Sequence, residues 1–287
     1  MELSNGVLSV AINERGAELT GAYNHLTEID YIWHGGKEWP KYSPLLFPIV
    51  GGLKNGEYEY KGKTYKLSRH GFAREKDFTV IQSNKTSAWF SLSSDDSTLE
   101  VYPFPFELQV RYHLEYNSVT IAYHVMNKGR ETMLFSIGGH PAFGLPFEKG
   151  LKYEDYFLLF NKPEKADRWP VTSSGLISSK PEKFFRGEQK LNLRKDLFLN
   201  DALVFKNLNS DQVSIVSYKS SHGIDLKFSG FPYLGIWAAK NADFVCIEPW
   251  HGIGDHEDAT GRLEEKEGIL KLEPGGEFSA SWKLRVF

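Results

Sequence analysis

The 287-residue sequence has a single cysteine, Cys246, so it cannot form an intramolecular disulfide, and no cysteine–histidine cluster has zinc-finger spacing. No apolar run approaches the roughly 18 residues of a membrane-spanning helix. The first residues show no basic segment followed by an apolar run, as a secretory signal would. The formal net charge of -3 argues against a protein that coats a nucleic-acid backbone. We therefore expect a cytoplasmic protein with neither a membrane nor a nucleic-acid partner.

Helical periodicity is scarce too, whereas apolar and polar residues alternate along many short stretches. These stretches are residues 7–12, 58–60, 63–67, 106–116, 119–125 and 278–287. The dipeptide Lys61-Gly62 joins two of them in a pattern typical of a β-hairpin. Many short strands separated by Gly, Asn and Pro predict an all-β sandwich or barrel.

The domain organisation is harder to read from the sequence. Residues 162–193 are rich in Pro, Ser, Lys and Glu, which indicates a long surface excursion or a linker. Because the strand pattern looks alike on both sides of it, we expect one domain over residues 1–287. Neither a GxGxxG motif nor a P-loop is present.

Residues suited to proton transfer stand in loops between the predicted strands, where functional residues concentrate. His140 follows two glycines at the end of an apolar strand, and imidazole titrates closest to neutral pH. A histidine bonded to a backbone carbonyl is an equal alternative. Glu248 stands at the end of another apolar strand, where partial burial would raise its pKa and make it a better base. Cys246 is interpreted as an inert core thiol.

Three more residues are candidates for binding. His70 stands between Arg69 and Arg74, and a guanidinium offers a planar fork for a hydroxyl, carboxylate or phosphate. A surface turn with solvated charges explains this segment at least as well. Asp201 follows Asn200 at a strand start, a position typical of a turn or a cap.

In order along the chain, these segments resemble the aldose 1-epimerase, or galactose mutarotase-like, family. The matching blocks are residues 16–19, 31–33, 47–51, 62–65, 70–72, 139–143, 246–250 and 272–275. The block at residues 70–74 is most similar to the branch associated with lactose operons and hexose-6-phosphate mutarotases. The resemblance implies a large antiparallel β-sandwich, the supersandwich. It also implies interconversion of the α and β anomers of a hexose or hexose phosphate, without cofactor or metal.

The resemblance further implies a role for each candidate. Glu248 would be the general base and His140 the general acid, with a nearby carboxylate favouring a protonated imidazole at the start. His70 and Asp201 would hold sugar hydroxyls, and Arg74 would bind a phosphate or a hydroxyl. Trp237 and Trp250 are candidates for stacking on a sugar ring, although a Trp in a β-rich protein is more often part of the core.

One position departs from the family pattern. Many relatives carry an arginine where this sequence has Gly52, and the nearest cation is Lys54. Lysine is a point charge that cannot copy a planar fork. Either Lys54 or Arg74 would therefore bind in its place, or the substrate differs.

Three other functions stay open at this stage. A carbohydrate-binding or regulatory protein on the same fold would bind sugar without catalysis. A glycosidase would need two carboxylates, and Asp201 is the candidate partner of Glu248. In a structural interaction module, the contexts of His140 and Glu248 would be accidental. The expected partner is a small-molecule aldose, and exposed edge strands permit a homodimer.

Overall fold

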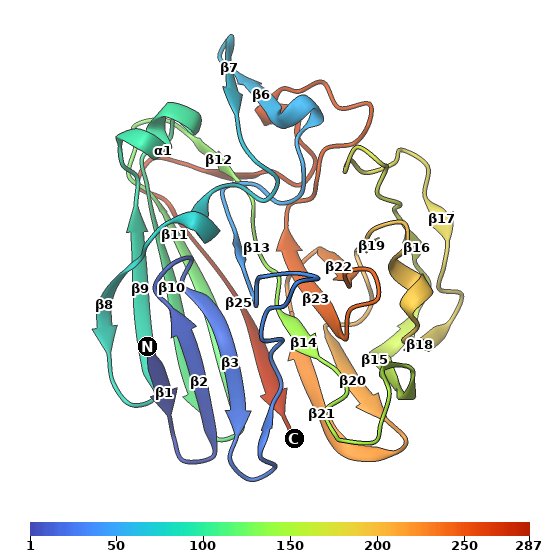
Figure 1. The fold of residues 1–287 in the computed structure, drawn as a ribbon. Helices are drawn as coiled ribbons and strands as arrows, with labels where there is room; N and C mark the ends of the chain where they lie inside the picture. Colours follow the sequence, from blue (N-terminus) through green and yellow to red (C-terminus); the bar gives the residue numbers. More distant parts are fainter.

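The computed structural model describes residues 1–287 and consists mainly of antiparallel strands (Figure 1). The strands are β1 (Glu2–Ser4), β2 (Leu8–Asn13), β3 (Glu18–Asn24), β4 (Ile29–Asp30), β5 (Leu45–Leu46), β6 (Glu57–Tyr60), β7 (Lys63–Lys66), β8 (Thr79–Ser83), β9 (Ser87–Ser93), β10 (Phe106–Glu115), β11 (Ser118–Asn127), β12 (Met133–Phe135), β13 (Ile137–Gly139), β14 (Ala142–Gly144), β15 (Tyr156–Glu164), β16 (Asp167–Arg168), β17 (Glu182–Lys183), β18 (Glu188–Asn192), β19 (Leu203–Lys206), β20 (Gln212–Ser217), β21 (Ser220–Lys227), β22 (Tyr233–Trp237), β23 (Phe244–His251), β24 (Leu270–Leu272) and β25 (Glu277–Val286).

Helical structure is limited to short segments. They are the α-helix α1 (Asp96–Val101) and the 3₁₀ turns η1 (Lys54–Gly56), η2 (Ala73–Glu75), η3 (Tyr153–Asp155), η4 (Lys195–Phe198) and η5 (Leu263–Glu265). Asp95 begins α1 with a capping box, because its side chain accepts from the N–H of Thr98. No helix of this structure has the length and apolar character needed to cross a membrane. The cytoplasmic location stays a prediction.

Two large sheets carry the fold. Nine strands form one sheet in the order β18-β15-β20-β21-β25-β11-β10-β9-β8, and β19-β22-β23-β13-β5 form a second sheet to which β14 adds by pairing with β23. A third sheet, β1-β2-β3-β4, lies at the N-terminal end of the chain (Figure 1). The hydroxyl of Tyr112 in β10 donates to the carbonyl of Ala17 at 2.7 Å, which ties the third sheet to the first. The all-β prediction is confirmed.

The longest predicted strands are found where alternation placed them. Residues 106–116 and 119–125 correspond to β10 and β11, which pair in register with Val110 opposite Tyr123. Their apolar side chains alternate inward, as a sheet with one buried face requires. The hairpin of β6 and β7 is confirmed as well. Lys61 and Gly62 have φ of 51° and 75°, the left-handed pair that a tight two-residue hairpin turn needs.

The segment 162–193 corrects one expectation. It begins inside β15, continues through β16 and β17, and ends one residue after β18 at an edge of the nine-stranded sheet, so strands run through the expected surface excursion. Between β16 and β17, residues 169–181 fold back onto the loop after β23, where Ile177 bridges to His256.

Buried apolar side chains form two clusters. One holds 67 residues and extends along the chain from Leu3 to Val286, as expected when strands far apart in sequence share one interior. The other lies where the segment 169–181 meets the six-stranded sheet, and contains Leu46, Val50, Val171, Ile177, Val204, Trp250 and Ile253. The smaller cluster forms part of the wall of the cavity described next.

Candidate active site

A cavity of about 250 Å³ lies beside the six-stranded sheet. Five of the six predicted site residues line it: His70, Arg74, His140, Asp201 and Glu248. They come from four separate parts of the chain. Glu248 is in β23, His140 directly follows β13, and Asp201 lies between η4 and β19. His70 precedes η2 and Arg74 lies within it.

His140 and Glu248 meet at the cavity. The His140 Nε2 atom lies 3.2 Å from the Glu248 Oε2 atom, and the two side chains are 9% and 3% exposed. The antiparallel pairing of β13 with β23 explains the contact. Gly138 lies opposite Trp250, so His140, two residues after Gly138, comes close to Glu248, two residues before Trp250. An acid and a base within hydrogen-bond reach of each other can move a proton between them.

Burial shifts both groups toward their neutral forms. Desolvation lowers the pKa of His140 to about 3, and the positive charges of Arg69 and Arg74 act in the same direction. Desolvation also raises the pKa of Glu248 well above its ordinary value, against the opposing charge of Arg69. Burial thus opposes the expectation that the carboxylate would keep His140 protonated.

His70 presents one defined tautomer. Its Nδ1 atom accepts a hydrogen bond from the N–H of Gly51 at 3.1 Å, so the neutral ring carries its proton on Nε2. Burial, and then the nearby His140, hold the pKa of His70 well below its ordinary value. Gly71 makes this loop possible, because a Cβ there would lie 2.3 Å from the carbonyl oxygen of Phe47. The arrangement offers a substrate one imidazole N–H donor.

Two guanidinium groups and one carboxylate line another part of the cavity. Arg74 donates through Nη2 to the carbonyl of Arg69 at 2.8 Å, and its buried Nε makes no hydrogen bond within the protein, lying 3.9 Å from Glu75 Oε1. Arg69 contacts Asp201 at 3.4 Å between Nη1 and Oδ2. Asp201 also accepts from the N–H of Ala202 at 2.7 Å. Polar groups capable of binding hydroxyls or an anion therefore stand close to the buried pair.

The structure contradicts the prediction that Lys54 contributes to the binding site. Lys54 does not line this cavity, and its Nζ atom donates to the carbonyl of Ala259 at 3.0 Å. The space beside the neighbouring Gly52 is already occupied, because a Cβ there would lie 3.2 Å from the carbonyl oxygen of Gly175. The cations that reach the cavity are Arg69 and Arg74. Lys54 was a poor candidate because closeness in sequence says nothing about which way a loop turns.

Several lining residues were not predicted. Trp39 comes from the loop between β4 and β5, and Val171, Gly175 and Ile177 come from the supposed surface excursion. Their positions depend on long-range folding, and no local motif marks them.

Two tryptophans suggested as stacking partners for a sugar do line the cavity. Trp237 ends β22, and Trp250 is in β23. The indole of Trp250 fits against strand glycines: a Cβ on Gly235 would lie 2.4 Å from its ring, and one on Gly138 would lie 2.6 Å from it. The glycines of β13 and β22 were thus the available signal for this side of the site.

Three buried side chains in this region carry atoms that bind metals. The ligand atoms of His140, Cys246 and Glu248 lie within 4.8 Å of one another. Burial raises the pKa of the Cys246 thiol well above its ordinary value, which disfavours the thiolate that a metal needs. Arg69 and Arg74 add positive charge at the same cavity. The arrangement therefore suits proton transfer better than cation binding.

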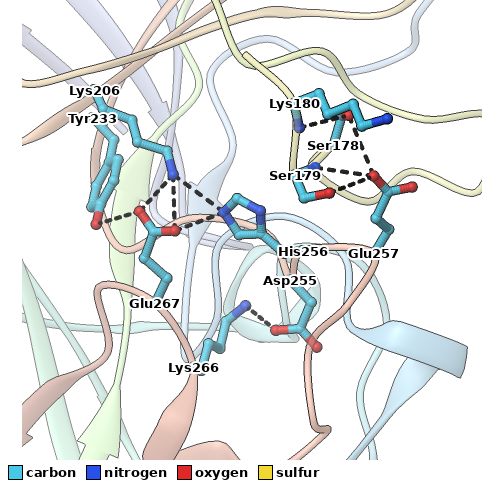
Figure 2. A network of polar contacts seen from close by, with 10 residues as sticks. All are labelled: Ser178, Ser179, Lys180, Lys206, Tyr233, Asp255, His256, Glu257, Lys266 and Glu267. Atoms are coloured by element: carbon cyan, nitrogen blue, oxygen red, sulfur yellow. Dashed lines mark hydrogen bonds and ion pairs between the residues drawn. The ribbon is translucent and has the colours of Figure 1, made fainter.

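A separate polar network holds part of the cavity wall in place (Figure 2). Ile177 donates its N–H to the carbonyl of Asp255 at 2.8 Å, and Glu257 accepts from the N–H of Ser179 at 3.0 Å. Beneath these contacts, Lys266 forms a buried ion pair with Asp255 at 2.7 Å. The network attaches residues 169–181 to the loop after β23, so that Val171 and Ile177 face the cavity.

The rest of the network in Figure 2 is paired internally. Glu267 accepts from Lys206 at 2.7 Å and lies 2.6 Å from His256 Nε2. Lys206 also lies 3.6 Å from the ring centre of Trp169. These contacts link Trp169 and the loop after β23 to Lys206 in β19, so they help to attach residues 169–181 to the six-stranded sheet.

Comparison with known proteins agrees with this geometry. The model of the family described as aldose 1-epimerase matches residues 1–271. The chromosomal protein LacX of Lactococcus lactis subsp. lactis is 34% identical over 298 residues, covering 100% of this chain and 99% of that protein.

Solved structures show the same similarity. A galactose mutarotase related enzyme from Lactobacillus acidophilus is 36% identical with a TM-score of 0.94, covering 100% of this chain and 97% of that one. A galactose mutarotase-like protein from Lactobacillus casei is 28% identical with a TM-score of 0.92, covering 100% of this chain and 99% of that one. The expected antiparallel β-sandwich of galactose mutarotase-like proteins is thereby confirmed.

Proposed function

The chain belongs to the aldose 1-epimerase family, and we propose that it is a mutarotase that interconverts the α and β anomers of a hexose or hexose phosphate. One observation carries the proposal. His140 and Glu248, an acid and a base, lie 3.2 Å apart on the wall of a cavity that also offers polar binding groups. Mutarotation requires a base, an acid and a defined pocket, and these residues supply all three.

The reaction begins with two proton transfers. Glu248 removes the proton of the anomeric hydroxyl while His140 protonates the ring oxygen, so that the ring opens to the aldehyde. Rotation about the C1–C2 bond presents the other face of the carbonyl. The two groups then exchange roles and close the ring, which returns each proton to its starting place.

Burial assists ring opening. These transfers need a carboxylate and an imidazolium and leave both groups neutral, so the neutral resting pair must first pass the Glu248 proton to His140, 3.2 Å away. Desolvation favours neutral forms of both side chains, so it makes Glu248 a stronger base and His140 a stronger acid. Burial thus lowers the barrier from the charged pair to the open chain, while it raises the free energy needed to form that charged pair from the neutral one.

The remaining polar groups would bind the sugar. His70 offers its Nε2–H to a hydroxyl, and Asp201 offers carboxylate lone pairs. Arg69 and Arg74 together provide two guanidinium groups, and Arg74 has a buried Nε that makes no hydrogen bond within the protein. Their positive charge supports a substrate with an anionic group as well as a neutral hexose.

The test is polarimetry of freshly dissolved α-glucose and α-galactose with catalytic amounts of protein. The 6-phosphates are assayed in parallel by an anomer-specific coupled method. We expect faster equilibration for at least one sugar, and its loss in Glu248→Gln. The matched control is Glu2→Gln, an exposed residue of the N-terminal sheet that should keep the wild-type rate.

Two further assays distinguish the other candidate functions. Sugar binding by calorimetry without faster equilibration of any of these sugars would indicate a carbohydrate-binding protein. Asp201 and Glu248 do line one cavity, which is the arrangement a glycosidase would need. Release of a chromogenic aglycone would support that function, and we expect none. A single domain over residues 1–287 is part of the proposal, and the homodimer stays a prediction.

A further inference from the structure

We propose that Trp39 is a positioning residue for His140, whose indole holds the imidazole in the orientation that directs Nε2 at Glu248 and keeps water from it. The inference rests on the proposed mutarotase function, in which His140 gives and takes a proton. Trp39 lines the cavity with His140 but belongs to a loop that none of the sequence motifs includes.

The two rings are stacked. Their centres lie 5.0 Å apart and their planes differ by 26°. Trp237 and His70 meet the same imidazole edge-on, at 5.8 Å and 5.7 Å between ring centres. Three rings thus surround His140 and leave it 7% exposed.

Stacking is needed here because the usual means of orienting a histidine is missing. A functional imidazole is normally held by a hydrogen bond at its second nitrogen. The Nδ1 atom of His140 is buried and bonds to no other residue; the only backbone contact of the ring that affects its pKa is with His140 itself. Rotation of the ring is therefore limited by its aromatic neighbours and by the contact of Nε2 with Glu248.

Trp39 is itself held firmly enough to position another ring. Its N–H and its carbonyl both bond to Gly36, at 3.1 Å and 3.0 Å, and the carbonyl also accepts from Trp33 Nε1 at 3.0 Å. Its indole stacks on Phe244 at 5.5 Å and meets Trp237 at 5.7 Å. The loop between β4 and β5 thus places a rigid aromatic surface over the imidazole.

The test compares Trp39→Phe, which keeps a ring for stacking, with Trp39→Leu, which keeps apolar volume without one. We expect Trp39→Phe to retain most of kcat. Trp39→Leu should lose roughly ten- to a hundredfold in kcat, the cost of a small misplacement of a catalytic group, with a smaller change in KM. The matched control is Trp89→Leu, a half-buried tryptophan of β9 outside the cavity.

A second readout follows the ionisation of His140 by NMR of its ring nitrogens, without any sugar. The charged or titratable groups facing this ring are Glu248, Cys246, His70, Arg69 and Arg74. They are unchanged in the variants, so any shift reports the entry of water. In Trp39→Leu the pKa of His140 should rise from about 3 toward its ordinary value.

An unchanged kcat and an unchanged His140 titration in Trp39→Leu would overturn the proposal. A rise in KM alone would also overturn it, since that would make Trp39 only a sugar contact. If the wild type accelerates no sugar but the titration still shifts, the proposed function fails while the positioning of His140 stands. The two conclusions are thus tested separately.

Discussion

Replacing Glu248 with glutamine should remove most of the catalysis without weakening the fold. A well-placed general base typically contributes about 10²–10⁴-fold in rate. Each tenfold corresponds to about 1.4 kcal/mol, so the loss should raise the barrier by roughly 3–5 kcal/mol. Glutamine has nearly the same shape and no charge, so it should still fit beside His140.

The effect on stability follows from burial. Glu248 is 2% exposed, and desolvation raises its pKa in the folded protein above the unfolded value. Above the unfolded pKa, the unfolded chain releases a proton that the folded protein retains, so wild-type stability falls as pH rises. Glutamine carries no such penalty. The variant should therefore be at least as stable as the wild type, with a gap that widens from pH 5 to pH 8.

Urea unfolding at the two pH values, together with polarimetry, checks both halves of the prediction. Glu2→Gln should match the wild type in rate and in stability, because Glu2 is exposed. A Glu248→Gln variant that keeps the wild-type rate would refute the assignment of the base. A variant less stable than the wild type at pH 8 would refute the argument from desolvation.

Three further predictions concern the scaffold. Lys266→Met should lower the free energy of unfolding by about 3–5 kcal/mol, because it leaves Asp255 buried and unpaired, and adding Asp255→Asn should restore part of it. A denaturation midpoint unchanged in the single variant would contradict this. Gly71→Ala should destabilise far more than Gly62→Ala: both have positive φ, but a Cβ at Gly71 would lie 2.3 Å from a backbone oxygen, whereas nothing lies within 4 Å at Gly62. Equal melting temperatures would count against it. His251→Gln should reduce acid sensitivity. Burial lowers the folded pKa of His251 to about 4, so its contribution is present above its unfolded pKa and is lost as pH falls toward 4. Parallel melting curves of wild type and variant from pH 7 to pH 4 would refute this reasoning.

Local sequence pattern predicted the strands because it reflects a local geometry. In β10 and β11 every second side chain faces the interior, so alternation can be read without knowing the partner strand. The turn at Lys61-Gly62 was equally predictable, since a tight hairpin demands positive φ at those positions.

The residues of the candidate site also fall into two groups, those that the local sequence predicted and those that depend on distant contacts. Glu248 and His140 were predictable because each is a polar residue that follows an apolar run in the sequence, where burial without a role is costly. Lys54 failed because its side chain bonds to Ala259 and not to the cavity. Trp39 was missed because its role depends on a contact with His140, about a hundred residues away along the chain.

The sequence by itself determined the all-β character of the protein, the order of its motifs and the residue types able to exchange protons. These properties follow from side-chain periodicity and chemistry, which act over a few neighbouring residues. Only the tertiary structure decided that β13 and β23 bring His140 and Glu248 to 3.2 Å, and that residues 169–181 close one wall of their cavity. Burial is a property of the whole fold. The preference of the pair for neutral forms therefore emerges only when distant segments exclude water from it.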